Sequence, residues 1–158
     1  MTSISGTLKH RERILQAIRD LPFHRYLGIE KLVANDGQAT LSLTVNKNTL
    51  NPGGMFHGAV AYAIADITAY AAAVSTLEEN QEAVTHDLHV SMLRPANDGD
   101  RIVTEANVVK RGRSIIFIDV AVYKEASHSL PDNSSQQPDN NPRALIAMDR
   151  VTKSVINY

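Results

Sequence analysis

Residues 51–77 read NPGGMFHGAVAYAIADITAYAAAVSTL, and this stretch decides the fold. From Phe56 to Leu77 it is long enough to cross a bilayer, but it is rich in alanine and carries Asp66 near its middle. A carboxylate at the centre of a bilayer costs about 2.5–3.5 kcal/mol on insertion scales. A helix that is apolar on all sides without spanning a membrane belongs in a protein core. We therefore predict a buried central helix.

The sequence on either side of this helix alternates as strands do. Residues 29–34 (IEKLVA) and 38–45 (QATLSLTV) flank Asn35-Asp36-Gly37, which predicts a hairpin. Four more runs of strand type follow the helix, at residues 83–93, 101–110, 114–125 and 144–156. Residues 5–20 predict a short amphipathic helix that ends at Leu21-Pro22. An antiparallel sheet wrapped around the central helix satisfies this order, so the predicted class is α+β.

Composition narrows the classes of function. The chain has 158 residues, a formal net charge of -1, 43% hydrophobic residues and no cysteine. This length fits one domain over residues 1–158. The charge offers no general hold on nucleic acid, and the lack of cysteine excludes disulfides and thiol nucleophiles. The polar start has no apolar signal segment, so we expect a cytoplasmic protein with neither a nucleic acid nor a membrane as partner.

Residues 126–143 (ASHSLPDNSSQQPDNNPR) separate the last two predicted strands. Their Ser, Asn, Gln, Asp and Pro side chains offer almost nothing apolar to bury, which predicts a flexible insertion. We assign it no function.

Asp66 is the candidate catalytic residue. A carboxylate in the middle of an apolar helix is costly unless it is paired or functional, and no Lys or Arg lies between Phe56 and Leu77. Tyr62 and Tyr70 lie one turn before and after it on the same face, where they could donate hydrogen bonds or line a substrate pocket. A hydrogen bond to a remote backbone group or arginine is the structural alternative.

The second candidate feature is the entry to the helix, from Asn51 to Gly58. Gly53 and Gly54 permit unusual backbone angles, and the first N–H groups of a helix suit a developing oxyanion. An ordinary turn into a helix is the alternative. His57 and Asp66 are nine residues apart, roughly 13–14 Å along a helix and on about opposite faces. Either the two features are unrelated, or a second subunit brings its Asp66 to the first one's Gly58 in a symmetric dimer.

His86 and His89 look like a metal pair but are three residues apart on a predicted strand, so their side chains face opposite sides. We predict no metal site.

The pattern Asn51-x-x-Gly54-x-x-His57-Gly58, with Asp66 nine residues after the histidine, resembles the signature of PaaI-like hotdog-fold acyl-CoA thioesterases of the phenylacetate-degradation type. The resemblance covers roughly residues 25–155 and includes the runs VTHDLHV (84–90), LRPA (93–96) and KRGRS (110–114). It implies a hotdog fold, a long helix wrapped by an antiparallel sheet, assembled into homodimers and often homotetramers.

The resemblance also implies roles for individual residues. Asp66 matches the catalytic carboxylate, which activates water or attacks the thioester, and Gly58 matches the N–H that polarises the thioester carbonyl. Asn51 matches a positioning side chain from the opposite subunit, with His57 supporting its loop, and Thr85 matches a hydroxyl that orients water. The residues matching those that contact the CoA phosphates and pantetheine are Arg111, Gly112, Arg113 and Ser114. The chain departs from the family at Ala59, where a second glycine is usual.

The resulting expectation is an acyl-CoA thioesterase that hydrolyses an acyl- or aryl-CoA to a free carboxylic acid and CoA, with no cofactor beyond the CoA of its substrate. A hotdog dehydratase would need a catalytic histidine, yet none follows Asp66 before His86. A regulator that senses CoA esters would need a DNA-binding module, for which the leading residues are too few. A non-catalytic acyl-CoA-binding protein stays open as the main alternative.

Overall fold

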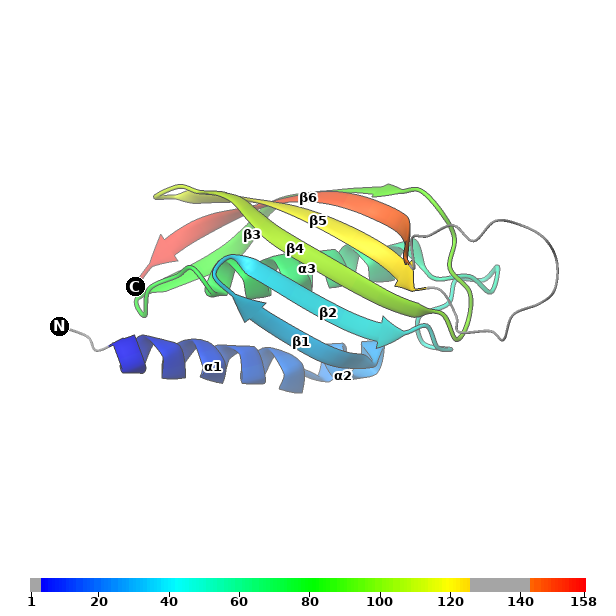
Figure 1. Cartoon of the computed structure of the whole chain (residues 1–158), viewed down its shortest axis with the longest axis horizontal. Helices are drawn as coiled ribbons and strands as arrows, with labels where there is room; N and C mark the ends of the chain where they lie inside the picture. Colours follow the sequence, from blue (N-terminus) through cyan, green and yellow to red (C-terminus); the bar gives the residue numbers. More distant parts are fainter. Residues whose placement is uncertain (1–3, 126–142) are drawn as a thin grey trace.

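The computed structural model describes residues 4–125 and 143–158, with side chains from residue 11 onward. Figure 1 shows their order along the chain. The helices are α1 (Ile4–Asp20), α2 (Pro22–Leu27) and α3 (Gly58–Val74). The strands are β1 (Ile29–Asn35), β2 (Gln38–Thr44), β3 (Gln81–Met92), β4 (Arg101–Arg111), β5 (Ile115–Glu125) and β6 (Arg143–Asn157).

The six strands form one antiparallel sheet in the order β1-β2-β4-β5-β6-β3, and α3 packs against it in contact with every strand (Figure 1). Side chains alternate along each strand, so that Leu41, Ile118 and Val151 are fully buried between sheet and helix. This arrangement confirms the predicted α+β class and the sheet wrapped around a central helix.

The sheet leaves one stripe of α3 uncovered, which the sequence analysis did not predict. Eleven of its 17 residues are buried. The other six residues are not buried. They are spaced one, three or four residues apart, so they lie along one face of the helix: Gly58, Ala59, Tyr62, Ala63, Asp66 and Tyr70. The side chain of Tyr62 is 44% exposed. The expectation that α3 is covered on all sides was therefore wrong along this stripe, which we call the open stripe.

The amino-terminal part contains one more helix than predicted. The first helix is confirmed as α1. Pro22, which was expected only to end this helix, also begins a second one, α2. Proline suits the first helical position, where its missing N–H has no partner to lose. Arg19 of α1 donates to the carbonyl oxygen of Leu32 in β1, and so covers part of an edge strand.

The first hairpin forms as predicted. Asp36 and Gly37 join β1 to β2 with φ angles of 47° and 79°, the positive values that a two-residue hairpin turn needs. The predicted flexible insertion falls on residues 126–142, outside the described part of the chain, and Arg143 already belongs to β6. Among the described helices, none combines the length and apolarity needed to cross a membrane.

Candidate active site

Asp66 lies on the open stripe of α3 and is held by two side chains from the sheet. Lys153 Nζ donates to Asp66 Oδ1 at 2.6 Å, and Thr85 Oγ1 donates to the same oxygen at 2.7 Å. Lys153 Nζ also donates to Thr85 Oγ1 at 2.7 Å, which closes a triangle of hydrogen bonds. The side chain of Asp66 is 37% exposed, whereas that of Lys153 is 1% exposed. Asp66 is thus anchored through Oδ1, while its Oδ2 accepts no hydrogen bond from any described residue.

The pairing of β3 with β6 brings the two anchoring residues together. Thr85 is the register partner of Lys153, and Asp87 is the partner of Thr152, so His86 is an extra residue in β3. Such a bulge locally re-aims side chains. Both Thr85 and Lys153 point toward α3 because both bond to Asp66.

Lys153 is the site residue that the sequence analysis missed. No cation lies within the central helix, but β6 supplies one across the fold. The structural alternative of a remote partner for Asp66 is therefore realised, with a lysine in place of the expected backbone group or arginine. The available signal was in the strand pattern, because Lys153 occupies an inward position between Val151 and Val155, both of which are buried.

Tyr70 and Glu82 complete the charged surroundings. The hydroxyl of Tyr70 donates to Glu82 Oε1 at 2.8 Å, and Lys153 Nζ lies 5.6 Å from the centre of the Tyr70 ring. Burial, helped by Glu82, raises the pKa of Tyr70 above its usual value. Burial lowers the pKa of Lys153, and Asp66 opposes that shift. Tyr70 therefore lies beside the triangle but donates to Glu82 and not to Asp66, whereas Tyr62 lies one turn away from Asp66 on the open stripe.

The entry to α3 is a second cluster. Asn51 Oδ1 accepts from the N–H groups of Gly53 and Met55 at 2.9 and 3.1 Å, which fixes the turn. His57 caps the helix, since its Nδ1 accepts from the N–H of Ala59 at 3.0 Å. The N–H of Gly58 begins the helix and donates to no acceptor within residues 4–125 and 143–158, as is usual for the first N–H of a helix.

One chain keeps the two clusters apart. The helix runs unbroken from Gly58 through Asp66, so the two residues are about 12 Å apart along its axis at 1.5 Å per residue. The structure thus brings together Asp66, Thr85 and Tyr70, and separately Asn51, His57 and Gly58. It does not join the two sets within one chain.

The predicted CoA-contacting segment lies between β4 and β5. Arg111, Ile116 and Lys153 share one register row across three strands, which places the backbone of Arg111 about 10 Å from that of Lys153. The guanidinium of Arg111 is already engaged, because it donates to Gln81 Oε1 at 2.9 Å and to the carbonyl of Gly112. Arg113 and Ser114 are exposed. Of the three polar side chains in this segment, two are therefore free to bind a ligand, those of Arg113 and Ser114.

Gly112 has a structural reason to be glycine. Its N–H donates to the carbonyl oxygen of Ile115 at 2.8 Å, and a Cβ added at this position would lie only 2.8 Å from that oxygen. The turn between β4 and β5 therefore depends on the missing side chain.

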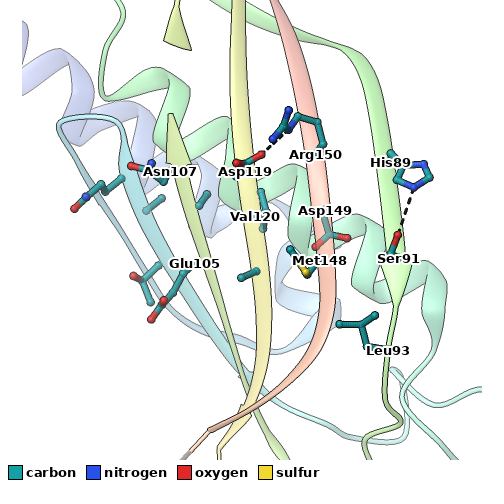
Figure 2. A pocket seen from close by; sticks show the side chains of 15 residues that line it. His89, Ser91, Leu93, Glu105, Asn107, Asp119, Val120, Met148, Asp149 and Arg150 are labelled. Carbon is teal, nitrogen blue, oxygen red and sulfur yellow. Dashed lines mark hydrogen bonds and ion pairs between the residues drawn. The ribbon is translucent and has the colours of Figure 1, made fainter. Parts of the chain in front are cut away.

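Figure 2 shows a hollow of about 940 Å³ that spreads over several strands of the sheet. Its lining includes an ion pair between Arg150 and Asp119, at 2.5 Å, but none of the predicted site residues. Volume alone therefore does not identify the candidate site. Within the described residues, no three His, Cys, Asp or Glu side chains are grouped as metal ligands.

Comparison with known proteins identifies the family. The sequence profile of the Thioesterase superfamily matches residues 53–130. A Deinococcus radiodurans protein named "Putative esterase" is 32% identical over 102 residues, which is 65% of this chain and 67% of that protein. Human acyl-coenzyme A thioesterase 13 is 28% identical over 131 residues, which is 82% of this chain and 91% of that protein. Matches to curated relatives span from 64% to 91% of those proteins' lengths.

Solved structures agree with this result. Thioesterase HI1161 of Haemophilus influenzae is 25% identical, with a TM-score of 0.73 over 92% of this chain and 90% of that one. The E. coli PaaI protein has a TM-score of 0.73 over 98% of this chain and 97% of that one. At 20% identity, this similarity shows a shared fold. The chain belongs to the thioesterase superfamily and has the hotdog fold of these thioesterases.

Proposed function

We propose that this thioester hydrolase acts on acyl- or aryl-CoA thioesters and releases a free carboxylic acid and CoA. One observation carries the proposal: Asp66 lies on the open stripe of α3, anchored through Oδ1 and with Oδ2 free. A fixed carboxylate with one unoccupied oxygen is suited to general-base or nucleophilic chemistry. The similarity to a human protein named acyl-coenzyme A thioesterase supports CoA esters as the substrate class.

The proposed reaction consumes one water molecule. Asp66 Oδ2 removes a proton from water as the water oxygen attacks the thioester carbonyl carbon, or Oδ2 attacks that carbon directly and water then hydrolyses the acyl-enzyme. The C–S bond breaks, and the CoA thiolate leaves and takes up a proton. The free N–H of Gly58 donates to the carbonyl oxygen as negative charge develops on it. No step requires a metal ion or a redox cofactor.

Because Gly58 and Asp66 of one chain are too far apart to act on one carbonyl, the proposed site is shared between two protomers of a homodimer. The open stripe supports this arrangement, since it leaves Ala59, Tyr62 and Ala63 uncovered beside Asp66. A second copy would cover these side chains and bring the entry of its own α3 to Asp66. Pairing of dimers into a homotetramer and a cytoplasmic location are parts of the same proposal.

For the CoA portion, we assign the exposed side chains of Arg113 and Ser114 to the phosphates and pantetheine. Arg111 and Gly112 shape the turn that presents them, through the contacts to Gln81 and Ile115.

The test is release of CoA from a panel of acetyl, medium-chain, long-chain, benzoyl and phenylacetyl esters. Free thiol can be followed with a thiol reagent without protein background, because the chain has no cysteine. We expect turnover of at least one ester by the wild-type protein and none by Asp66→Asn. Tight binding of the esters in calorimetry without any turnover would instead identify a non-catalytic acyl-CoA-binding protein.

A further inference from the structure

We propose that Lys153 is a positioning residue for the hydrolysis: its buried ammonium group fixes Asp66 through Oδ1, so that only Oδ2 meets the substrate. This inference rests on the proposed function. It adds a residue that none of the sequence motifs indicated, and it also changes the role expected of Thr85.

The hydrogen-bond directions within the triangle follow from the groups themselves. An ammonium group only donates, so Lys153 donates to both Asp66 Oδ1 and Thr85 Oγ1. Thr85 has one hydroxyl hydrogen, and the 2.7 Å contact directs it to Asp66 Oδ1. Thr85 therefore cannot donate to a substrate water while the triangle is closed. Its hydroxyl supports the carboxylate instead.

The burial of Lys153 calls for an explanation. Lysine is almost never fully buried unless it is paired, and its neighbours on the inward side of β6, Val151 and Val155, show that apolar side chains pack there. The cation compensates a carboxylate that is itself 37% exposed and could have been hydrated without help. An apolar residue would satisfy the core equally well, so the retained charge points to the function of Asp66.

The other groups facing the triangle are few. Tyr70 of α3 presents its ring to the ammonium, and Glu82 of β3 adds a second negative charge that favours the charged lysine. The ammonium nitrogen lies 2.6 Å from Asp66 Oδ1, so its charge and its hydrogen bond both fix that oxygen. Without the Lys153 charge, the carboxylate should lose this orientation, and kcat should fall while KM stays nearly unchanged.

Because the chain has no native cysteine, a single cysteine at position 153 can be alkylated selectively. Two reagents then produce side chains of equal length, one with the positive charge of lysine and one without it. In a Lys153→Cys chain, alkylation in denaturant with 2-bromoethylamine produces a side chain that matches lysine in length and charge. Alkylation with 1-iodopropane produces the matched neutral side chain. Both products are refolded, their folds are compared by circular dichroism, and kcat and KM are measured across pH. Wild-type protein passes through the same steps as the control.

We expect the propyl product to lose about 10- to 100-fold in kcat, a part of the 10²–10⁴ that a positioned base supplies, with little change in KM. The aminoethyl product should recover most of kcat. Equal kcat for the two folded products would overturn the inference and leave Lys153 a purely structural residue.

A second variant covers the case in which the alkylated chains do not refold. Thr85→Val removes the hydroxyl from an exposed side chain while keeping its volume. It should lower kcat with KM nearly unchanged, because Oδ1 loses one of its two donors and Lys153 loses one of its acceptors, and an unchanged kcat would overturn the inference. Failure of the proposed function is separate, because in that case wild-type protein releases no thiol from any ester.

Discussion

Asp66 Oδ2 is the atom on which the proposed chemistry depends. Asparagine at this position can keep the Oδ1 contacts to Lys153 and Thr85, but it presents an amide where the free oxygen was. We predict that Asp66→Asn lowers kcat by at least about 100-fold, the lower range for a general base. Thiol release measures kcat, and calorimetry with a CoA ester checks that binding remains. Turnover near the wild-type rate would contradict the assignment.

Asp149 of β6 is a second carboxylate in the core, only 6% exposed, and neither of its oxygens has a partner among the described residues. Burial raises its pKa to about 7. Because the folded pKa lies above the unfolded value near 4, the native state holds its proton longer. The contribution of Asp149 to the free energy of unfolding should therefore be most favourable below about pH 4 and decrease as the pH rises to about 7.

Asp149→Val tests this assignment, since valine matches the neighbouring inward residue Val151. We predict that the variant is more stable than wild type at pH 8, by on the order of 2–4 kcal/mol. The advantage should shrink at pH 5. Urea unfolding at the two pH values measures both quantities, and an advantage independent of pH would contradict the assignment.

The sequence predicted individual site residues only where the pattern that marks them lies close by in the chain. Asp66 and the helix entry were predicted because the relevant pattern lies within about one helix length of the chain. Lys153 meets Asp66 from 87 residues away, and only the pairing of β3 with β6 shows that they touch. The alternation around Val151 and Val155 indicates that Lys153 points inward, but not what it contacts.

At the level of elements, α3 and the six strands were predictable because each has enough residues to display its period. The six residues of α2 are too few for a helical pattern, and Pro22 ends one helix and begins the next, so the sequence showed only the break. The open stripe escaped prediction for a different reason. Ala59 and Ala63 are apolar like the buried alanines, so composition does not distinguish the face left for a partner.

The turn between β4 and β5 separates a binding role from a structural one. Arg113→Ala should raise KM for CoA esters about 3- to 5-fold, with a smaller effect at high salt, because an exposed charge contributes modestly and is screened. Its melting temperature should match wild type. Steady-state kinetics at two salt concentrations and thermal unfolding check both expectations. An unchanged KM would remove Arg113 from the CoA site.

Gly112→Ala is the matched structural variant in the same turn. The added methyl group would lie 2.8 Å from the carbonyl oxygen of Ile115, so the backbone must shift, at a cost of about 1–3 kcal/mol by analogy with overpacked sites. Urea unfolding should show this loss of stability. Full stability in the variant would show that the turn adapts without strain.

For the whole molecule, the separation of Gly58 from Asp66 predicts complementation between inactive chains. An Asn51→Ala chain disturbs the turn that presents Gly58, whereas an Asp66→Asn chain lacks the carboxylate. In a mixed dimer with shared sites, one site carries both defects and the other carries neither. Random pairing makes half of the dimers mixed, so co-refolded chains should recover about a quarter of wild-type activity.

Native mass spectrometry of the co-refolded sample shows whether subunits have exchanged. With exchange established, activity no higher than that of the separate variants would place each site within a single chain. Gel filtration of the wild-type protein provides the assembly size needed to interpret either result.

The extra residue His86 changes which positions of β3 point toward α3. Before it, the odd-numbered Ala83 and Thr85 point toward α3, and after it the even-numbered Leu88 and Val90 do so. A chain without His86 would still place Thr85 opposite Lys153 and Leu88 opposite Val151, now in regular alternation, so that both the hydroxyl beside Asp66 and the core side chains would be kept. Deletion of a residue within either regular half of the strand would instead turn the side chains beyond it to the opposite face. Position 86 is therefore the place in β3 where the loss of a single codon should be tolerated best.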